Sequence, residues 1–205
     1  MEFSGFTAIE AASAFELEIS QGETYSVEVD VDERLRDAVR ISQEGGTLHI
    51  GMEPFRALWP FGQGKRRVRI SLPVLEAIEL SGATRATAGD FKSDHDFRAS
   101  LSGASRLQAR IEAAAVSLDA SGASHCTLRG AGTKVALDAS GASRLELAEF
   151  TAPDATVELS GASSAAVRAT EQLAYNISGA SRLSYAGGPR IARGQSTGAS
   201  STSTL

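Results

Sequence analysis

Residues 116–147 read VSLDASGASHCTLRGAGTKVALDASGASRLEL, which is one pattern passed through twice. Each pass places the tetrapeptide SGAS between two short runs in which apolar and polar residues alternate. Strict alternation is the period of a β-strand that buries one of its two faces. The stretch therefore predicts a unit of strand, sharp corner and strand, which returns after 19 residues.

The tetrapeptide occurs seven times, once as SGAT and once as TGAS, at intervals of 18 to 21 residues. The copies begin at Ser81, Ser102, Ser121, Ser140, Ser160, Ser178 and Thr197. A unit of this length is too short for a propeller blade of about 40 residues, and it shows no helical periodicity. We therefore predict an all-β fold, a single-stranded parallel β-helix with coils of about 19 residues. The preference of parallel crossovers makes it right-handed.

Alignment of the copies predicts which side chains face the core. The inward positions lie one and three residues before the first motif residue, and five and seven residues after it. Leu118, Leu137 and Val157 form one such column, whereas Asp138 faces water. Cys126 falls in an inward column and its neighbour His125 points outward, so the two cannot chelate one metal ion. We predict that Cys126 is a buried structural thiol.

The second motif position is predicted to need a positive φ, which glycine adopts without a steric penalty. We also expect the motif serines to form ladders along the axis, each hydroxyl bonding its neighbour or a corner amide. The corner glycines are Gly82, Gly103, Gly122, Gly141, Gly161, Gly179 and Gly198.

The whole chain, 1–205, is predicted to be one β-helix domain. Residues 3–51 lack the motif but alternate well, which predicts a strand-rich amino-terminal section of first coils or a cap. Within it we expect a short helix over 32–39 and a turn at Gly45-Gly46. Residues 53–67 are predicted to be an aromatic and basic loop, 68–200 the SGAS coils and 201–205 a frayed tail.

Composition excludes several classes of protein. The chain has 205 residues, of which 42% are hydrophobic and 22% charged, so it is not disordered. A net charge of -5 argues against a nucleic-acid partner. No apolar run is long enough to span a bilayer, and one cysteine allows no intrachain disulfide. The first residues lack the features of a signal peptide, so we expect either an intracellular protein or a mature form.

The repeated SGAS coils, together with residues 5–10 and the run 68–78, resemble the putative auto-transporter adhesin, head GIN domain family of bacteria. The similarity extends over roughly residues 3–200. It implies a right-handed β-helix, an adhesin-like role and a location in the cell envelope or outside the cell. Because no signal peptide is present, the cytoplasm stays open as a location.

Two charged columns flank the corner. An acidic column holds Glu79, Asp119, Asp138 and Glu158, and a basic column holds Arg85, Arg106, His125, Arg144 and Arg182. One interpretation is that the two columns neutralise each other across the corner. The other is that the arginines bind an anion or an acidic glycan, which suits their planar, bidentate hydrogen bonding.

The loop 53–67 is a second candidate site, because it holds the only tryptophan, Trp59, with Phe55 and Phe61, before Lys65-Arg66-Arg67. These aromatic side chains either bind a sugar, a partner or a membrane surface, or fold back to plug the end of the β-helix.

We predict a non-catalytic binding module with a glycan or protein ligand at a surface, without metal or cofactor. Formation of a homo-oligomer stays open. The alternative is a β-helix polysaccharide lyase or hydrolase, which needs clustered acid and base groups in a cleft. The best such cluster, Asp94-His95-Asp96, lies in the longest interval between motifs and is predicted to be a solvated loop. His49 is predicted to be an outward strand residue.

Overall fold

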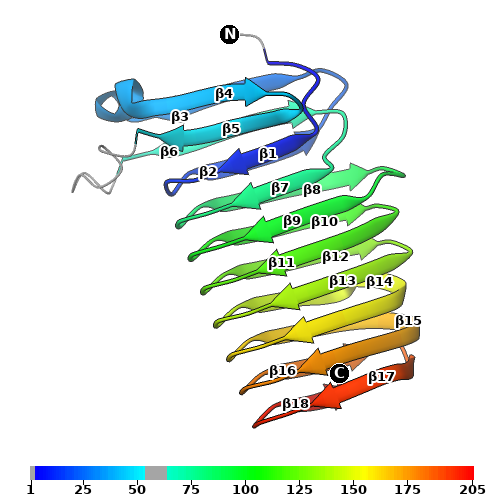
Figure 1. Ribbon diagram of the computed structural model, residues 1–205. Helices are drawn as coiled ribbons and strands as arrows, with labels where there is room; N and C mark the ends of the chain where they lie inside the picture. Colours follow the sequence, from blue (N-terminus) through cyan, green and yellow to red (C-terminus); the bar gives the residue numbers. More distant parts are fainter. Residues whose placement is uncertain (1–2, 54–63) are drawn as a thin grey trace.

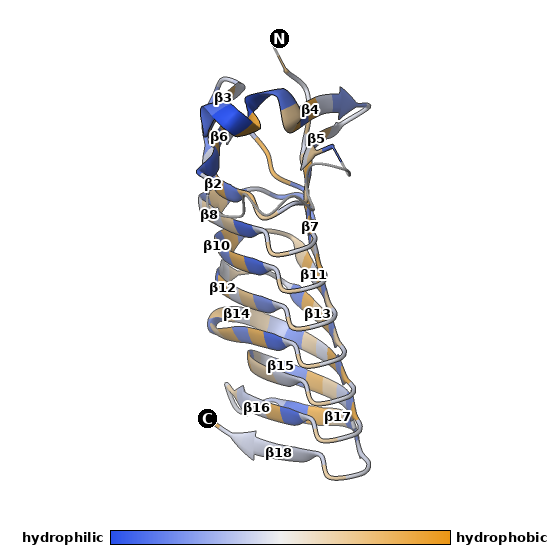
Figure 2. Cartoon of the chain, turned by 90° about the vertical axis from the view of Figure 1, so that its left-hand side faces the viewer, coloured by the Kyte–Doolittle hydropathy of each residue, from blue (hydrophilic) through white to orange (hydrophobic). Residues whose placement is uncertain are grey.

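The computed structural model describes residues 3–53 and 64–205 and consists almost entirely of strands. It is a β-solenoid, in which the chain winds through stacked coils that share one continuous core (Figure 1). Each coil contributes one strand to each of two walls, and the SGAS corner joins these strands (Figure 2). The prediction of a single-stranded β-helix is thereby confirmed.

The first wall precedes the corners and carries the acidic column. Its strands, in spatial order, are β4 (Val39–Glu44), β5 (Thr47–Met52), β1 (Ala8–Ala11), β7 (Ala77–Leu80), β9 (Phe97–Leu101), β11 (Ala115–Ala120), β13 (Lys134–Ala139), the second halves of β14 (Arg144–Leu159) and β15 (Ser164–Ile177), and β17 (Arg190–Ser196). All these pairings are parallel except β4 with β5.

The second wall follows the corners and carries the basic column. Its strands are β3 (Ser26–Val31), β6 (Arg66–Leu72), β2 (Glu16–Gln21), β8 (Arg85–Lys92), β10 (Arg106–Glu112), β12 (His125–Ala131), the first halves of β14 and β15, β16 (Arg182–Ala186) and β18 (Ser201–Thr204). Only β3 with β6 is antiparallel here.

The predicted inward rows fill the space between the walls. Leu118, Leu137 and Val157 pair in register in successive coils and are at most 3% exposed, and Cys126 is fully buried. Burial raises the pKa of the Cys126 thiol to about 12, so the side chain stays neutral. This confirms the prediction of a structural thiol.

At each corner the glycine adopts the predicted positive φ, between 71° and 74° in the seven copies. In the first six copies its carbonyl accepts a hydrogen bond of 2.7 or 2.8 Å from the motif alanine amide of the next coil. A Cβ atom on Gly122 would lie 2.5 Å from the carbonyl oxygen of Gly103, and the other inner copies are as tight. The glycine is therefore required both for its φ and for the close stacking of the coils.

The expectation of hydroxyl ladders is wrong. The last motif residue is buried in six of the seven copies, and in five copies its hydroxyl donates to the carbonyl of the first residue of its own corner, as Ser124 does to Ser121 at 2.8 Å. The same bond forms at Ser105, Ser143, Ser181 and Ser200. The hydroxyls of Thr84 and Ser163 are buried without such a bond. A hydrogen bond within the corner gives the buried hydroxyl a partner without help from the next coil. The regular ladder of hydrogen bonds between corners is therefore made by backbone groups alone.

An eighth corner, which the motif search missed, lies at residues 12–15. The amides of Ser81 and Arg85 donate to the carbonyls of Ala11 and Phe15, as the equivalent amides do in later coils. Ser13 adopts a φ of 67° where later corners have glycine, and the ring of Phe15 is buried where they have serine or threonine. The amino-terminal section thus includes a true coil, formed by β1 and β2.

The amino-terminal end of the core is covered by a cap. The predicted helix is a 3-10 helix, Glu33–Ala38, whose first turn is capped by the Asp32 carboxylate. Its Leu35 and Ala38 side chains are buried over the core. The predicted turn at Gly45-Gly46 joins β4 and β5 as a hairpin. Antiparallel edge strands and a covering helix protect a sheet end against unwanted pairing.

At the other end, residues 201–204 form strand β18 on β16, so the expected frayed tail is wrong there. In this last coil Ser196, Thr202 and Thr204 pair in register with Ile177, Leu183 and Tyr185. The coil therefore carries hydroxyl groups at positions where its neighbour carries apolar side chains, as terminal repeats of solenoids commonly do.

Replacement of Gly122 by alanine should lower the free energy of unfolding by more than about 2 kcal/mol, because the new Cβ meets both the strained φ and the Gly103 carbonyl. The corresponding fall in melting temperature is roughly 5–10 °C. Gly51→Ala is the matched control, since no atom lies within 4 Å of its Cβ position. Equal melting temperatures for the two variants would contradict the proposed role of the corner.

The register of the walls predicts opposite outcomes for adjacent residues. Leu137→Asp should cost more than about 3 kcal/mol, because it places a carboxyl group without a partner in the core. Asp138→Ser should change stability by less than about 0.5 kcal/mol, because Asp138 is exposed. Thermal unfolding of both variants measures this difference, and the reverse order would show that the register is wrong.

Candidate functional site

The arginines predicted as a binding column lie in register on the outer side of the second wall. Arg85, Arg106, His125, Arg144, Ser164 and Arg182 occupy equivalent positions of β8, β10, β12, β14, β15 and β16. We call this outer surface the arginine face. Each position directly follows a corner whose geometry repeats, which is why the side chains leave the wall in the same direction.

The predicted neutralisation across the corner is wrong. In the described parts of the chain, no ion pair within 4.0 Å joins the acidic column to the basic column. The two columns leave opposite walls of the solenoid, so their charged groups point away from each other. Arg85, Arg106 and Arg182 likewise have no carboxylate within this distance among residues 3–53 and 64–205.

The arginines nearer the cap behave differently. Arg67 pairs with Glu16 at 3.1 Å and Arg69 with Glu18 at 2.9 Å, across adjacent strands of the second wall. The charge of this upper region is therefore compensated within the chain. Arg85 is the first arginine of the column; Glu16 of β2 is its register partner, but the Glu16 carboxylate pairs with Arg67.

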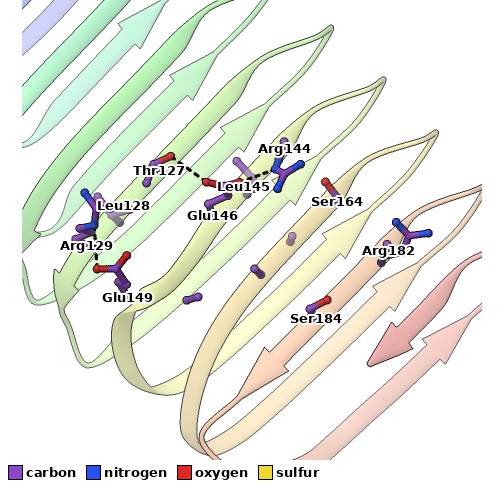
Figure 3. A pocket seen from close by; sticks show the side chains of 13 residues that line it. Thr127, Leu128, Arg129, Arg144, Leu145, Glu146, Glu149, Ser164, Arg182 and Ser184 are labelled. Atoms are coloured by element: carbon purple, nitrogen blue, oxygen red, sulfur yellow. Dashed lines mark hydrogen bonds and ion pairs between the residues drawn. The ribbon is translucent and has the colours of Figure 1, made fainter. Parts of the chain in front are cut away.

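A groove of about 370 Å³ opens on the arginine face, over β12, β14, β15 and β16 (Figure 3). Arg144 and Arg182 lie at its sides, and the small side chains of Ser164, Ala166 and Ser184 line it. The groove exists because the β15 coil carries serine and alanine at the two outward positions where the β14 coil carries Arg144 and Glu146. The loss of bulk in one coil creates a hollow between its neighbours.

A polar network fixes the upper side of the groove. The Arg144 Nε donates to the Glu146 carboxylate at 2.6 Å, and the Thr127 hydroxyl donates to the same group at 3.4 Å. Partial burial raises the pKa of the Glu146 carboxyl, but the hydrogen bond from Arg144 and the charges of Arg144 and His125 outweigh it. The net pKa is below its usual value, so Glu146 stays ionised at neutral pH.

Farther from the corner on the same strands, Arg129 pairs with Glu149 at 3.0 Å. Arg182 is thus the one cation among the groove-lining side chains that lacks a carboxylate partner in the described structure. An anion can bind Arg182 without displacing an existing ion pair.

Sequence reasoning placed Arg144 and Arg182 correctly but missed the groove between them. The signal was present, because in the aligned repeats Ser164 interrupts the basic column and Ala166 occupies the next outward position. The pairing of Arg129 with Glu149 was also missed, because it depends on a bulge in the pairing of β12 with β14 that the spacing does not reveal. Glu146 was missed although its partner Arg144 lies two residues away in the same strand.

The other clusters singled out from the sequence form ordinary surface contacts. His49 faces outward and pairs with Glu10 at 2.9 Å. His95 pairs with Glu76 at 2.8 Å in an exposed turn, as predicted for the Asp94-His95-Asp96 segment. The described residues contain no group of three acidic, histidine or cysteine side chains that could hold a metal ion. Phe55, Trp59 and Phe61 lie outside the described residues.

Comparison with solved structures supports the fold. A putative adhesin from Bacteroides fragilis superposes with a TM-score of 0.87 at 16% identity, covering 98% of this chain and 93% of its own. A putative adhesin from Parabacteroides merdae and a putative lipid binding protein from Parabacteroides distasonis both give 0.71, at 17% and 18% identity. Both alignments cover 100% of this chain and 94% of the other. No curated protein sequence matches significantly.

In the described residues, no helix combines the length and the hydropathy needed to cross a membrane. The family described as "Putative auto-transporter adhesin, head GIN domain" matches residues 5–189, which is most of the chain and includes the amino-terminal coil and the first six SGAS corners. The chain belongs to this adhesin family, as its SGAS repeats indicate.

Proposed function

We propose that this protein is a non-catalytic binding module of the cell surface or envelope, and that its arginine face binds anionic glycans. The observation that carries the proposal is the row of in-register arginines, of which Arg85, Arg106 and Arg182 lack an internal carboxylate partner in the described structure. Unpaired guanidinium groups on a flat, regular face are suited to bidentate contacts with carboxylate or sulfate groups.

The chemistry of the groove favours binding over hydrolysis. A glycosidase needs a carboxylic acid that holds a proton at neutral pH, and such a group has a raised pKa. In the groove the pKa of Glu146 is lowered, and Glu149 is held by Arg129. Both carboxylates are therefore engaged with arginines. The adhesin family supports the same role and a location at the cell surface or envelope.

The test is binding to immobilised acidic polysaccharides, with neutral dextran as the reference. At about 0.01 M ionic strength, where screening is weak, the protein should bind the acidic polymers and not dextran. The double variant Arg106→Gln/Arg182→Gln should bind at least about tenfold more weakly, because each charged hydrogen bond contributes about 1.5–3 kcal/mol.

Arg98→Gln is the matched control, since Arg98 is exposed on the first wall, on the opposite side of the solenoid. Equal binding by the double variant and the wild type would overturn the arginine face as the site. Release of new reducing ends or unsaturated products from the polysaccharide would overturn the non-catalytic assignment.

A further inference from the structure

We infer that the groove selects a sparsely charged acidic glycan, with one carboxylate per two sugar units, lying along the solenoid axis. This inference rests on the proposed function and gives it a ligand class. It follows from the spacing of the arginines, the hollow between two of them and the carboxylates at the groove.

The spacing comes from the order of residues down the column. Arg106, Arg144 and Arg182 lie in alternate coils, and His125 and Ser164 occupy the coils between them. Adjacent strands are about 4.8 Å apart, so these arginines recur at about 10 Å. Two sugar units of an extended polysaccharide span a similar length, so carboxylates one disaccharide apart come level with successive arginines. Those at Arg106 and Arg182 meet guanidinium groups that have no carboxylate partner in the described structure, whereas Arg144 is already paired with Glu146.

The coils between them are suited to uncharged parts of the chain. His125 is engaged by the Thr127 hydroxyl at 3.3 Å and lies 3.6 Å from the Glu146 carboxylate. At Ser164 the wall carries only small side chains, which form the hollow between Arg144 and Arg182. Its volume of about 370 Å³ is at the lower end of the range of small-ligand sites, which fits one or two sugar rings.

The two carboxylates at the groove disfavour the binding of densely charged anionic polymers. Glu146 and Glu149 accept hydrogen bonds from sugar hydroxyls, but they repel a sulfate or a second carboxylate brought close to them. Arg182 supplies the single uncompensated positive charge. The groove therefore matches one anionic group flanked by hydroxyl groups.

An acidic peptide fits the same face less well. Side chains on one side of an extended strand recur at about 6.8 Å, which matches neither one coil spacing nor two. Two successive carboxylates of such a peptide therefore cannot lie level with two successive arginines of the series Arg106, Arg144 and Arg182. A polysaccharide with a disaccharide repeat keeps its alignment from Arg106 to Arg182, and Arg85, one coil before Arg106, lies outside this series.

The experiment compares three probes of equal length by fluorescence anisotropy. These are a hyaluronan oligosaccharide, which alternates one carboxylated and one uncharged sugar, a heparin oligosaccharide, which is densely sulfated, and a dextran oligosaccharide. The wild type should bind hyaluronan more tightly than heparin and should not bind dextran. Affinity should increase stepwise as the hyaluronan chain lengthens by disaccharides, until it spans Arg106 to Arg182.

Two variants and one control variant make the test specific. Arg182→Gln should weaken hyaluronan binding at least about tenfold, whereas Arg98→Gln should leave it unchanged. Ser164→Arg fills the hollow and makes the basic column continuous, so it should weaken hyaluronan binding and strengthen heparin binding. All three positions lie on the outer side of the walls, and circular dichroism is the check that each variant is folded.

The outcomes separate the two levels of the proposal. Tighter binding of heparin than of hyaluronan, with loss in Arg182→Gln, would overturn the sparse-charge inference while leaving the arginine face as the site. Binding of an acidic probe that is unaffected by Arg182→Gln and by the Arg106→Gln/Arg182→Gln variant, or no binding of either acidic probe, would overturn the proposed function itself.

Discussion

The carbonyls of the corner glycines from Gly82 to Gly179 each accept a hydrogen bond from the alanine amide of the next coil, and from Gly103 onward no Cβ atom fits at this contact. This contact fixes the distance and the rotation between successive coils. Each corner residue therefore stands directly over its equivalent in the coil before. Every column of the solenoid, inward or outward, inherits its register from this repeated backbone bond.

The register has opposite consequences on the two sides of a wall. Inside, it stacks leucine, valine and alanine into a continuous core and places the last motif hydroxyl where, in five of the seven copies, it bonds within its own corner. On the outside, the register places side chains of like charge one strand spacing apart, and their repulsion is unfavourable unless a group of opposite charge lies between them. Near the cap, glutamates on β2 provide it for Arg67 and Arg69. On the later coils, Arg85, Arg106 and Arg182 have no such internal partner in the described structure, and a ligand can supply one.

Much of the fold could be predicted because the repeat is regular and the period of a strand is two. The burial of Leu137 beside the exposed Asp138 follows directly from alternation. The corner at residues 12–15 could not be recognised, because Ser13 adopts the strained φ without glycine and Phe15 replaces the buried serine. The antiparallel cap depends on long-range pairing of β3 with β6, which no local pattern specifies. The groove forms because Ser164 is small where its register partner Arg144 is long. A search for motif residues does not detect that a large side chain is missing.

The central functional claim is that the uncompensated arginines of the second wall contact the ligand. Arginine labelling with a dicarbonyl reagent, read out residue by residue by mass spectrometry with and without a hyaluronan oligosaccharide, tests it most directly. We predict that the ligand protects Arg106 and Arg182, while Arg98 on the opposite wall reacts as before. Protection of Arg98 alone, or unchanged labelling of Arg106 and Arg182 at a saturating ligand concentration, would contradict the claim.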